Sequence, residues 1–240
     1  MRAVSQAVIL MAGAGSRLRG SFGNLPKPLI PILDRPLISY TIDAIVAAEV
    51  SQIVFIVGYE RERLTAAVKY LAPPQADVRF IENPQWQKQN GISLLAAAKH
   101  TAAPFLLTMS DHIFEPAIVD LVNLAIDRKI DSIFDPDDAM KVQTQGNKIV
   151  AIGKDLVDYD AIDTGLFVCP LDIFDYLERA KKNDDCSLAD GVRLMAANGK
   201  VRAIDIGSAW WQDVDTPEML LQAEKRMRSA TGAKAKTVSR

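Results

Sequence analysis

The first half of the chain alternates apolar runs with amphipathic segments. The runs are rich in branched residues and are typical of strands buried on both faces of a parallel sheet. We predict strands over residues 6–11, 53–57, 78–81 and 105–109, and helices over 37–48, 61–70 and 91–99. This β-α-β-α alternation indicates an open α/β sheet that binds its ligand beyond the carboxyl ends of the strands.

The pattern changes after Ile130 to short apolar segments joined by turn residues. These predict an inserted β-hairpin region with strands over 131–134, 140–144, 148–152 and 163–168. Helices over 171–181 and 188–198, a strand over 201–206, and a helix capped by Thr216 with Pro217 in its first position follow. We expect one domain over residues 1–228 and a flexible basic tail over 229–240.

Composition and charge exclude several classes of protein. The 240 residues are 49% hydrophobic and 24% charged, as in an ordinary globular domain. The net charge of -2 argues against nucleic-acid binding through a strong positive field, so no nucleic-acid partner is expected. No apolar run approaches the ~18 residues of a membrane span, so we expect no transmembrane segment and a cytoplasmic location. Cys169 and Cys186 lack metal-site spacing and are expected to be structural thiols.

A glycine-containing turn, AGAGSR over residues 12–17, directly follows the first strand. Gly13 and Gly15 let the backbone approach a phosphate closely, and Arg17 and Lys27 supply compensating charge, so the turn favours a polyphosphate ligand. The turn lacks the ending of a Walker loop, and Leu18 occupies the third-glycine position of a dinucleotide fingerprint. A tight turn with surface basic residues is the alternative.

Two carboxylates are candidates for binding Mg²⁺, which prefers oxygen ligands. Asp111 follows the strand over 105–109, although it could instead cap a helix that starts near Pro116. Asp213 and Asp215 share one face of an extended segment. Asp215 could serve the entrance of the following helix, which makes Asp213 the better candidate ligand.

Three further side chains are candidates for substrate binding. Lys141 and Lys154 lie in or beside the inserted hairpins and could hold a second phosphate, although isolated lysines are more often solvated. His112 either contacts substrate or packs against its own loop.

Together these segments resemble the nucleotidyltransferase superfamily that activates sugar and alcohol phosphates. The resemblance rests on LMAGAGSR (10–17), PKPL (26–29), SDH (110–112), IDTG (162–165) and WQDVDTP (211–217). NGISLL (90–95), MSDH (109–112), DAMKV (138–142) and IGKDL (152–156) are most similar to inositol-1-phosphate cytidylyltransferases.

The resemblance implies a Rossmann-like fold of the GT-A type, with a mixed, mainly parallel sheet flanked by helices, and Mg²⁺ at Asp111 and Asp213. It implies base recognition by residues 89–93 and acceptor binding around Lys141, Lys154 and Asp163. We assign Arg17 and Lys27 to catalysis at the triphosphate. The remaining nucleotide-binding candidates are Ala12, Gly13, Ala14, Gly15, Ser16, Asn90, Gly91, Ser93 and Ser110, and the remaining acceptor candidates are His112, Thr164 and Gly165.

The expected reaction is transfer of CMP from CTP to inositol 1-phosphate, giving CDP-inositol and pyrophosphate. Phosphocholine, an aminoalkyl phosphonate or a hexose 1-phosphate are alternative acceptors, and UTP or dTTP alternative donors. A non-catalytic nucleotide-binding regulatory module is the alternative from another class. The incomplete fingerprint disfavours a nicotinamide-dependent oxidoreductase. We expect a monomer or homodimer, with a functional link to a membrane CDP-alcohol phosphotransferase.

Overall fold

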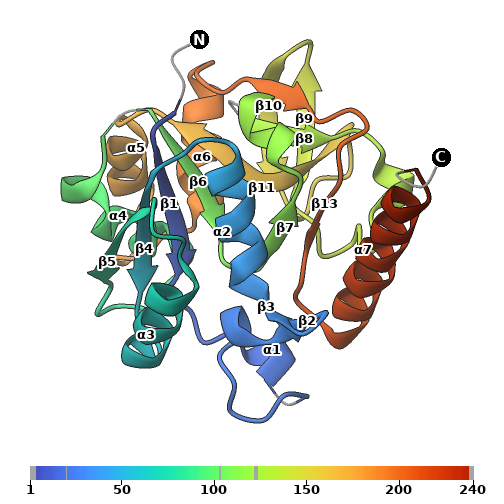
Figure 1. Ribbon diagram of the computed structural model, residues 1–240. Coiled ribbons are helices and arrows are strands. Elements are labelled where there is room, and N and C mark those ends of the chain that lie inside the picture. Colours follow the sequence, from blue (N-terminus) through green and yellow to red (C-terminus); the bar gives the residue numbers. More distant parts are fainter. Residues whose placement is uncertain (1–3, 20, 103, 122–123, 238–240) are drawn as a thin grey trace.

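The computed structural model describes residues 4–19, 21–102, 104–121 and 124–237 (Figure 1). Within these residues the main sheet has nine strands. Seven follow the order β10-β9-β11-β6-β1-β4-β5, while β8 pairs with β11 and β12 pairs with β8. The strands are β1 (Gln6–Met11), β4 (Gln52–Val57), β5 (Asp77–Glu82), β6 (Phe105–Met109), β8 (Leu124–Asp127), β9 (Lys141–Gln145), β10 (Lys148–Gly153), β11 (Ala161–Cys169) and β12 (Ala203–Asp205).

The sheet is mixed and mainly parallel on its β6-β1-β4-β5 side, as predicted. β1 pairs in parallel with both β4 and β6, and β5 pairs in parallel with β4. β11 reverses direction and runs antiparallel to β6. β9 and β10 form the antiparallel hairpin that the turn at Gly146 predicts.

Helices cover both faces of this sheet (Figure 1). Side chains alternate along β1: Val8 and Leu10 pack toward α4 (Asn90–Ala96), α5 (Ile173–Ala180) and α6 (Leu188–Ala197). Ile9 and Met11 pack toward α2 (Leu37–Ala47) and α3 (Arg61–Leu71) on the opposite face. The continuous apolar run of β1 therefore reflects burial on both sides.

The prediction of a strand over residues 131–134 is wrong. This segment begins in a short 3-10 helix, η4 (Ile130–Ser132), and the position beside β11 is taken by β8. Local polar contacts explain the turn, since the Lys129 backbone N–H donates to Asp127 and the Ser132 hydroxyl donates to the Lys129 carbonyl. The fully buried LAID segment of β8 supplies the apolar strand instead.

Several short elements lie outside the main sheet. β7 (His112–Phe114) pairs with β13 (Trp211–Asp213), and β2 (Pro31–Ile32) pairs with β3 (Arg35–Pro36). The short helices are α1 (Ser16–Arg19), η1 (Lys27–Leu29), η2 (Ala98–His100) and η3 (Pro116–Leu121). The β7–β13 pair, which the sequence pattern does not predict, builds part of the site described below.

The last helix, α7 (Pro217–Thr237), begins as predicted. The Thr216 hydroxyl accepts a hydrogen bond from the Met219 backbone N–H at 3.3 Å, and Pro217 occupies the first helical position. The helix includes residues 229–237, for which the sequence predicts a flexible tail. Ala and Lys, frequent in this segment, have high helix propensity, and residues 238–240 lie outside the described part of the chain. Among the described residues, no helix combines the length and apolar character needed to span a membrane.

Candidate active site

The glycine-containing turn and Asp111 lie together because β1 and β6 are parallel neighbours. Their carboxyl ends meet at one edge, where the Ser110 backbone N–H donates to the Leu10 carbonyl at 3.1 Å. Gly15 has a φ of +59°, and a Cβ there would lie 2.5 Å from Cβ of Lys27. Glycine at this position therefore allows Lys27 to pack under the turn.

A cavity of about 290 Å³ opens beside this turn. It is lined by Leu10, Met11, Gly13, Gly15, Ser16, Arg17, Lys27, Pro28, Ser110, Asp111 and Asp215. A Cβ on Gly13 would meet nothing within 4 Å, so no packing contact explains the glycine there. The exposed backbone of the turn and the two cations suit a phosphorylated ligand.

The antiparallel pair of β7 and β13 brings Asp111 and Asp213 together. His112 lies opposite Asp213 in the register, and the Val214 backbone N–H donates to the Asp111 carbonyl at 3.0 Å. The folded chain thereby places two acids that are far apart in sequence at neighbouring backbone positions.

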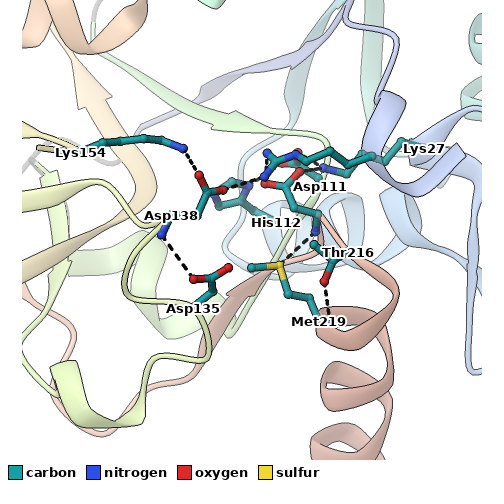
Figure 2. Close-up of polar contacts among 10 residues, drawn as sticks. Lys27, Asp111, His112, Asp135, Asp138, Lys154, Thr216 and Met219 are labelled. Atoms are coloured by element: carbon teal, nitrogen blue, oxygen red, sulfur yellow. Dashed lines mark hydrogen bonds and ion pairs between the residues drawn. The ribbon is translucent and has the colours of Figure 1, made fainter.

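The inner part of the site is a buried group of alternating charges (Figure 2). The ammonium of Lys27 donates to Oδ2 of Asp111 at 2.6 Å and also contacts Oδ1 of Asp215. Nδ1 of His112 lies 2.6 Å from Oδ1 of Asp111, and the His112 ring stacks on Trp211. The side chain of Lys27 is only 9% exposed and that of Asp111 23%, so these contacts are largely shielded from water.

The buried contacts favour the charged forms of Lys27, Asp111 and His112. Burial opposes the charge on Lys27, but the carboxylates of Asp111 and Asp215 outweigh it and raise its pKa. Burial likewise opposes ionisation of Asp111, but Lys27 and His112 hold its pKa below the usual range. The pKa of His112 is raised because its contact with Asp111 outweighs its own burial.

The outer part of the site continues the alternation of positive and negative side chains and is more exposed to water. Arg17 donates through one nitrogen to Oδ2 of Asp215 at 2.7 Å and through the other to Oδ2 of Asp138 at 2.6 Å. Lys154 donates to the second oxygen of Asp138 (Figure 2). Hydrogen bonds from Lys154 and Arg17 lower the pKa of Asp138. The carboxylate of Asp138 therefore links a cation of the glycine turn to a cation of the β9–β10 hairpin.

A second cavity, of about 580 Å³, adjoins the first. Asp111 and Asp215 line both cavities, while Lys154, Asp138 and Asp163 line only the larger one. One oxygen of Asp163 accepts the Gly165 backbone N–H at 2.8 Å, and burial raises the pKa of this carboxyl to about 7. The two cavities could hold two ligands whose reactive groups meet at Asp111 and Asp215.

Asp213 is the carboxylate whose setting best fits a metal ligand. Among the described residues it forms no hydrogen bond or ion pair through its side chain, and burial, reinforced by Asp111 and Asp215, raises its pKa. Within the same residues no cluster of three or more His, Cys, Asp or Glu side chains could enclose a metal ion. Mg²⁺ is commonly held by one or two carboxylates plus substrate phosphates, and the pair of Asp111 and Asp213 fits that type of site.

The structure divides the candidate residues into three groups. Those lining the smaller cavity are Gly13, Gly15, Ser16, Arg17, Lys27, Ser110 and Asp111. Those lining the larger cavity are Asn90, Asp111, His112, Lys154, Asp163, Gly165 and Asp213. Ala12, Ala14, Gly91, Ser93, Lys141 and Thr164 line neither of these two cavities.

Two acceptor candidates outside the cavities have contacts within the fold. The ammonium of Lys141 donates to the Lys154 carbonyl at 2.9 Å and lies 5.6 Å from the Tyr159 ring centre. The buried Thr164 hydroxyl donates to the Ala125 carbonyl at 2.8 Å. Lys141 can therefore affect the site by supporting the backbone at Lys154.

The proposed base-recognition segment is also engaged in packing. The side-chain oxygen of Asn90 accepts the Leu188 backbone N–H at 2.8 Å, and the Ser93 hydroxyl accepts from Asn83 at 3.0 Å. A Cβ on Gly91 would lie 2.5 Å from the Cys186 carbonyl oxygen. Base recognition by this segment stays a prediction.

Sequence reasoning did not place Asp138 in the site, and it ranked Asp215 below Asp213 as a candidate ligand. Asp215 lies two residues after Asp213, and the sequence leaves it open between the metal-facing side and the helix entrance; in the structure it contacts both Arg17 and Lys27. The even spacing from Asp213 was a signal for it. Asp138 begins the DAMKV segment that the resemblance includes, but the sequence does not indicate its ion pairs, because its partners Arg17 and Lys154 come from separate parts of the chain.

Comparisons with known proteins identify the family of the chain. The family model described as a MobA-like NTP transferase domain matches residues 7–153. The chain is 34% identical over 229 residues to a bifunctional IPC transferase and DIPP synthase of Rubrobacter xylanophilus, covering 91% of this chain and 51% of that protein. A protein of the same name from Thermococcus kodakarensis is 34% identical over 235 residues, with 95% and 52% covered. The chain thus spans about half the length of these curated relatives.

A solved structure shows a similar fold along nearly the whole chain. The inositol-1-phosphate CTP transferase from T. maritima superposes with a TM-score of 0.81 at 26% identity, covering 90% of this chain and 91% of that one. A UDP-glucose pyrophosphorylase complexed with UDP-glucose superposes with a TM-score of 0.79 at 16% identity, covering 95% and 99% of the two chains. At 16% identity, the similarity to the UDP-glucose pyrophosphorylase is one of fold alone.

Proposed function

The chain belongs to the MobA-like NTP transferase family and is an enzyme of the nucleotidyltransferase type, and from this premise we propose that it transfers CMP from CTP to inositol 1-phosphate. The products are CDP-inositol and pyrophosphate. The choice of CTP and inositol 1-phosphate is supported by the names of the relatives described above.

The observation that carries the proposal is the meeting of two cavities at Asp111 and Asp215. Arg17 and Lys27 supply positive charge on the side of the smaller cavity, and Lys154 does so on the side of the larger one. A triphosphate in the first and a phosphorylated alcohol in the second would present their phosphates to each other. Such positioning supplies much of the rate enhancement in phosphoryl-type transfer.

In the proposed reaction a phosphate oxygen of the acceptor attacks the α-phosphorus of CTP. The bond to the β-phosphate oxygen breaks, and pyrophosphate leaves with that electron pair. The acceptor phosphate is already ionised near neutral pH, so no general base is needed. Arg17 and Lys27 neutralise charge on the triphosphate in the transition state.

Substrate phosphates would exchange partners with the carboxylates of the site. Lys27 is held by Asp111 and Asp215, and Arg17 by Asp138 and Asp215. A triphosphate carries more charge than one carboxylate, and it would draw both cations toward itself. The carboxylate oxygens of Asp111 would then become available.

We propose that Asp111 and Asp213 hold Mg²⁺ when substrates are bound. The ion would supply Lewis-acid polarisation and charge neutralisation at the phosphate oxygens. The donor set suits it, because both groups are carboxylates and the side chain of Asp213 forms no ion pair among the described residues, although His112 and Lys27 lie near enough to act on its charge.

The decisive assay measures pyrophosphate release over a matrix of four nucleoside triphosphates and several phosphorylated alcohols, with and without Mg²⁺. We expect the greatest turnover with CTP and inositol 1-phosphate, and formation of CDP-inositol detected by ³¹P NMR. Greater turnover with phosphocholine, an aminoalkyl phosphonate or a hexose 1-phosphate would reassign the acceptor. No product with any pair would favour a nucleotide-binding regulatory module.

Lys27→Ala tests whether turnover comes from this site. Loss of a preorganised cation at the reacting phosphate costs on the order of 10²–10³ in rate. The control is Lys99→Ala, which removes an exposed lysine of η2 that lines neither of the two cavities described. Full turnover by Lys27→Ala would refute the assignment.

We further propose a cytoplasmic location and use of the product by a membrane CDP-alcohol phosphotransferase. The double name of the curated relatives supports the use of the product by a second enzyme, because it pairs IPC transfer with a synthase activity. Co-expression with such a phosphotransferase and a hydroxyl-bearing acceptor should transfer the phosphoinositol group of CDP-inositol to that hydroxyl, giving an inositol phosphodiester and CMP. Persistence of CDP-inositol would contradict the link.

A further inference from the structure

Asp138 lies between the cations of the smaller cavity and a cation of the larger one. Its two oxygens are divided between Arg17, which lines only the smaller of the two cavities, and Lys154, which lines only the larger. It reaches this position from the loop between η4 and β9, where its backbone N–H donates to Oδ1 of Asp135 at 3.3 Å (Figure 2). One carboxylate thus contacts the cations expected to hold both substrates.

The ion pairs of Asp138 lie at the exposed end of the charge network, where a ligand can most readily replace the carboxylate. The side chains of Arg17 and Asp138 are 54% and 36% exposed, whereas those of Lys27 and Asp111 are 9% and 23% exposed. Ion pairs open to water contribute little free energy, and a phosphate can replace the carboxylate in them more readily than in a buried pair. Substrate phosphates would therefore displace Asp138 before they disturb the inner pair.

We propose that Asp138 is a positioning residue that couples the two phosphate sites. It holds Arg17 and Lys154 in place while the sites are empty and competes with phosphate at each of them. A phosphate that takes Arg17 removes one of the two cations holding Asp138 and also repels its carboxylate. Asp138 then competes less at Lys154, and the second phosphate binds more tightly.

This proposal rests on the proposed function only in that both substrates bring phosphates to Arg17 and Lys154. It can be tested by binding without turnover. Inorganic tripolyphosphate is the probe for the site at Arg17, and inorganic phosphate is the probe for the site at Lys154. Tryptophan fluorescence can report binding, because Trp210 and Trp211, two of the three tryptophans, line the larger cavity.

In the wild type, saturating tripolyphosphate should tighten phosphate binding about fivefold, the effect of removing one exposed ion-pair competitor. By reciprocity, phosphate should tighten tripolyphosphate binding by the same factor. In Asp138→Asn, phosphate alone should bind about fivefold more tightly than to the wild type, and tripolyphosphate should no longer improve it. Asp138→Ala, which has no amide to contact the anion, should behave in the same way.

The matched control is Asp137→Asn, which removes the same charge from the neighbouring exposed residue. Asp137 lines neither of the two cavities, so this variant should keep both the wild-type phosphate affinity and the coupling. An equal gain of affinity in Asp137→Asn would show a general charge effect and overturn the proposal. Unchanged or weaker phosphate binding in both Asp138 variants, or coupling that persists in them, would also overturn it.

A turnover assay distinguishes failure of this proposal from failure of the proposed function. The binding test keeps its meaning if another nucleotide and acceptor prove to be the substrates. Conversely, a wild-type enzyme that makes CDP-inositol but shows no coupling between the two anions would refute the role of Asp138 alone.

Discussion

At the scale of single residues, the site is governed by how far each charge is compensated. Lys27 is buried, Asp111 is largely buried, and the two compensate each other, with Asp215 and His112 completing the group. Removing one member would leave the others uncompensated in a poorly solvated place, which is far more costly than losing an exposed pair. The carboxyl of Asp163 lacks such compensation, because among the described residues its only hydrogen-bond donor is the backbone N–H of Gly165.

Asp163→Asn should therefore change how stability depends on pH. The pKa of Asp163 is about 7 in the folded protein and near 4 in the unfolded chain, so the folded state binds more protons between these values. Stability contributed by the protonated carboxyl is fully present below pH 4 and is lost as the pH rises to 7. The variant lacks this loss and should be more stable than the wild type by roughly 1–3 kcal/mol at pH 8.

Urea unfolding of both proteins from pH 4 to pH 8 measures this difference. Asp131→Asn, at an exposed acid in η4, controls for the loss of one negative charge. A difference between Asp163→Asn and the wild type that stays constant over this pH range would contradict the prediction.

At the scale of elements, β11 shapes the wall of the larger cavity by an irregularity. Its register with β8 shifts between Asp163 and Phe167, and within this shift Gly165 has a φ of +72°. A Cβ on Gly165 would lie 2.3 Å from Nε2 of His112. The strand can therefore pass the imidazole only because residue 165 has no side chain.

Gly165→Ala should push His112 away and disturb its contact with Asp111. We expect a fall in kcat of at least about tenfold, in line with the sensitivity of such sites to small displacements, and a loss of stability of about 1–2 kcal/mol. Enzyme kinetics and thermal unfolding measure the two effects.

Gly146→Ala provides the matched control. Gly146 has a φ of +64°, but a Cβ there would meet nothing within 4 Å. It should share the backbone strain and keep wild-type kcat. Equal kcat in the two variants would show that the approach of Gly165 to His112 has no catalytic consequence.

At the scale of the whole molecule, the site forms where three separate parts of the chain meet. The parallel sheet supplies the glycine turn and Asp111, the β9–β10 hairpin region supplies Asp138 and Lys154, and the segment before α7 supplies the remaining acids (Figure 1). A cluster of Ile113, Val214 and Leu220 packs β7 and β13 against α7. This packing supports the β7–β13 pair, which holds the backbones of Asp111 and Asp213 side by side.

Asp213→Asn tests whether that packing creates a metal site. The amide keeps the shape of the side chain and removes its charge, so the Mg²⁺ concentration giving half-maximal activity should rise by about tenfold or more. Titration of activity with Mg²⁺, paired with thermal unfolding without the metal, separates metal affinity from folding. An unchanged Mg²⁺ requirement would remove Asp213 from the proposed ligand set.

The local pattern of side chains determined much of this protein. The apolar runs of β1, β4, β5 and β6 predict the parallel strands within one residue at either end, because burial on both faces requires continuous apolar sequence. Thr216 and Pro217 predict the start of α7, since capping depends on neighbouring residues. The place of the glycine turn at the strand ends follows from the same β-α alternation.

The tertiary structure decided which charged groups meet. Asp138 and Asp215 become site residues only when Arg17, Lys27 and Lys154 reach them from other elements, and no sequence periodicity encodes such contacts. β8 pairs with β11 in place of the strand expected over 131–134, because strand pairing depends on competition among segments across the sheet. Chain-local propensities specify elements, whereas the electrostatics of the site depend on distances that exist only after the elements have packed.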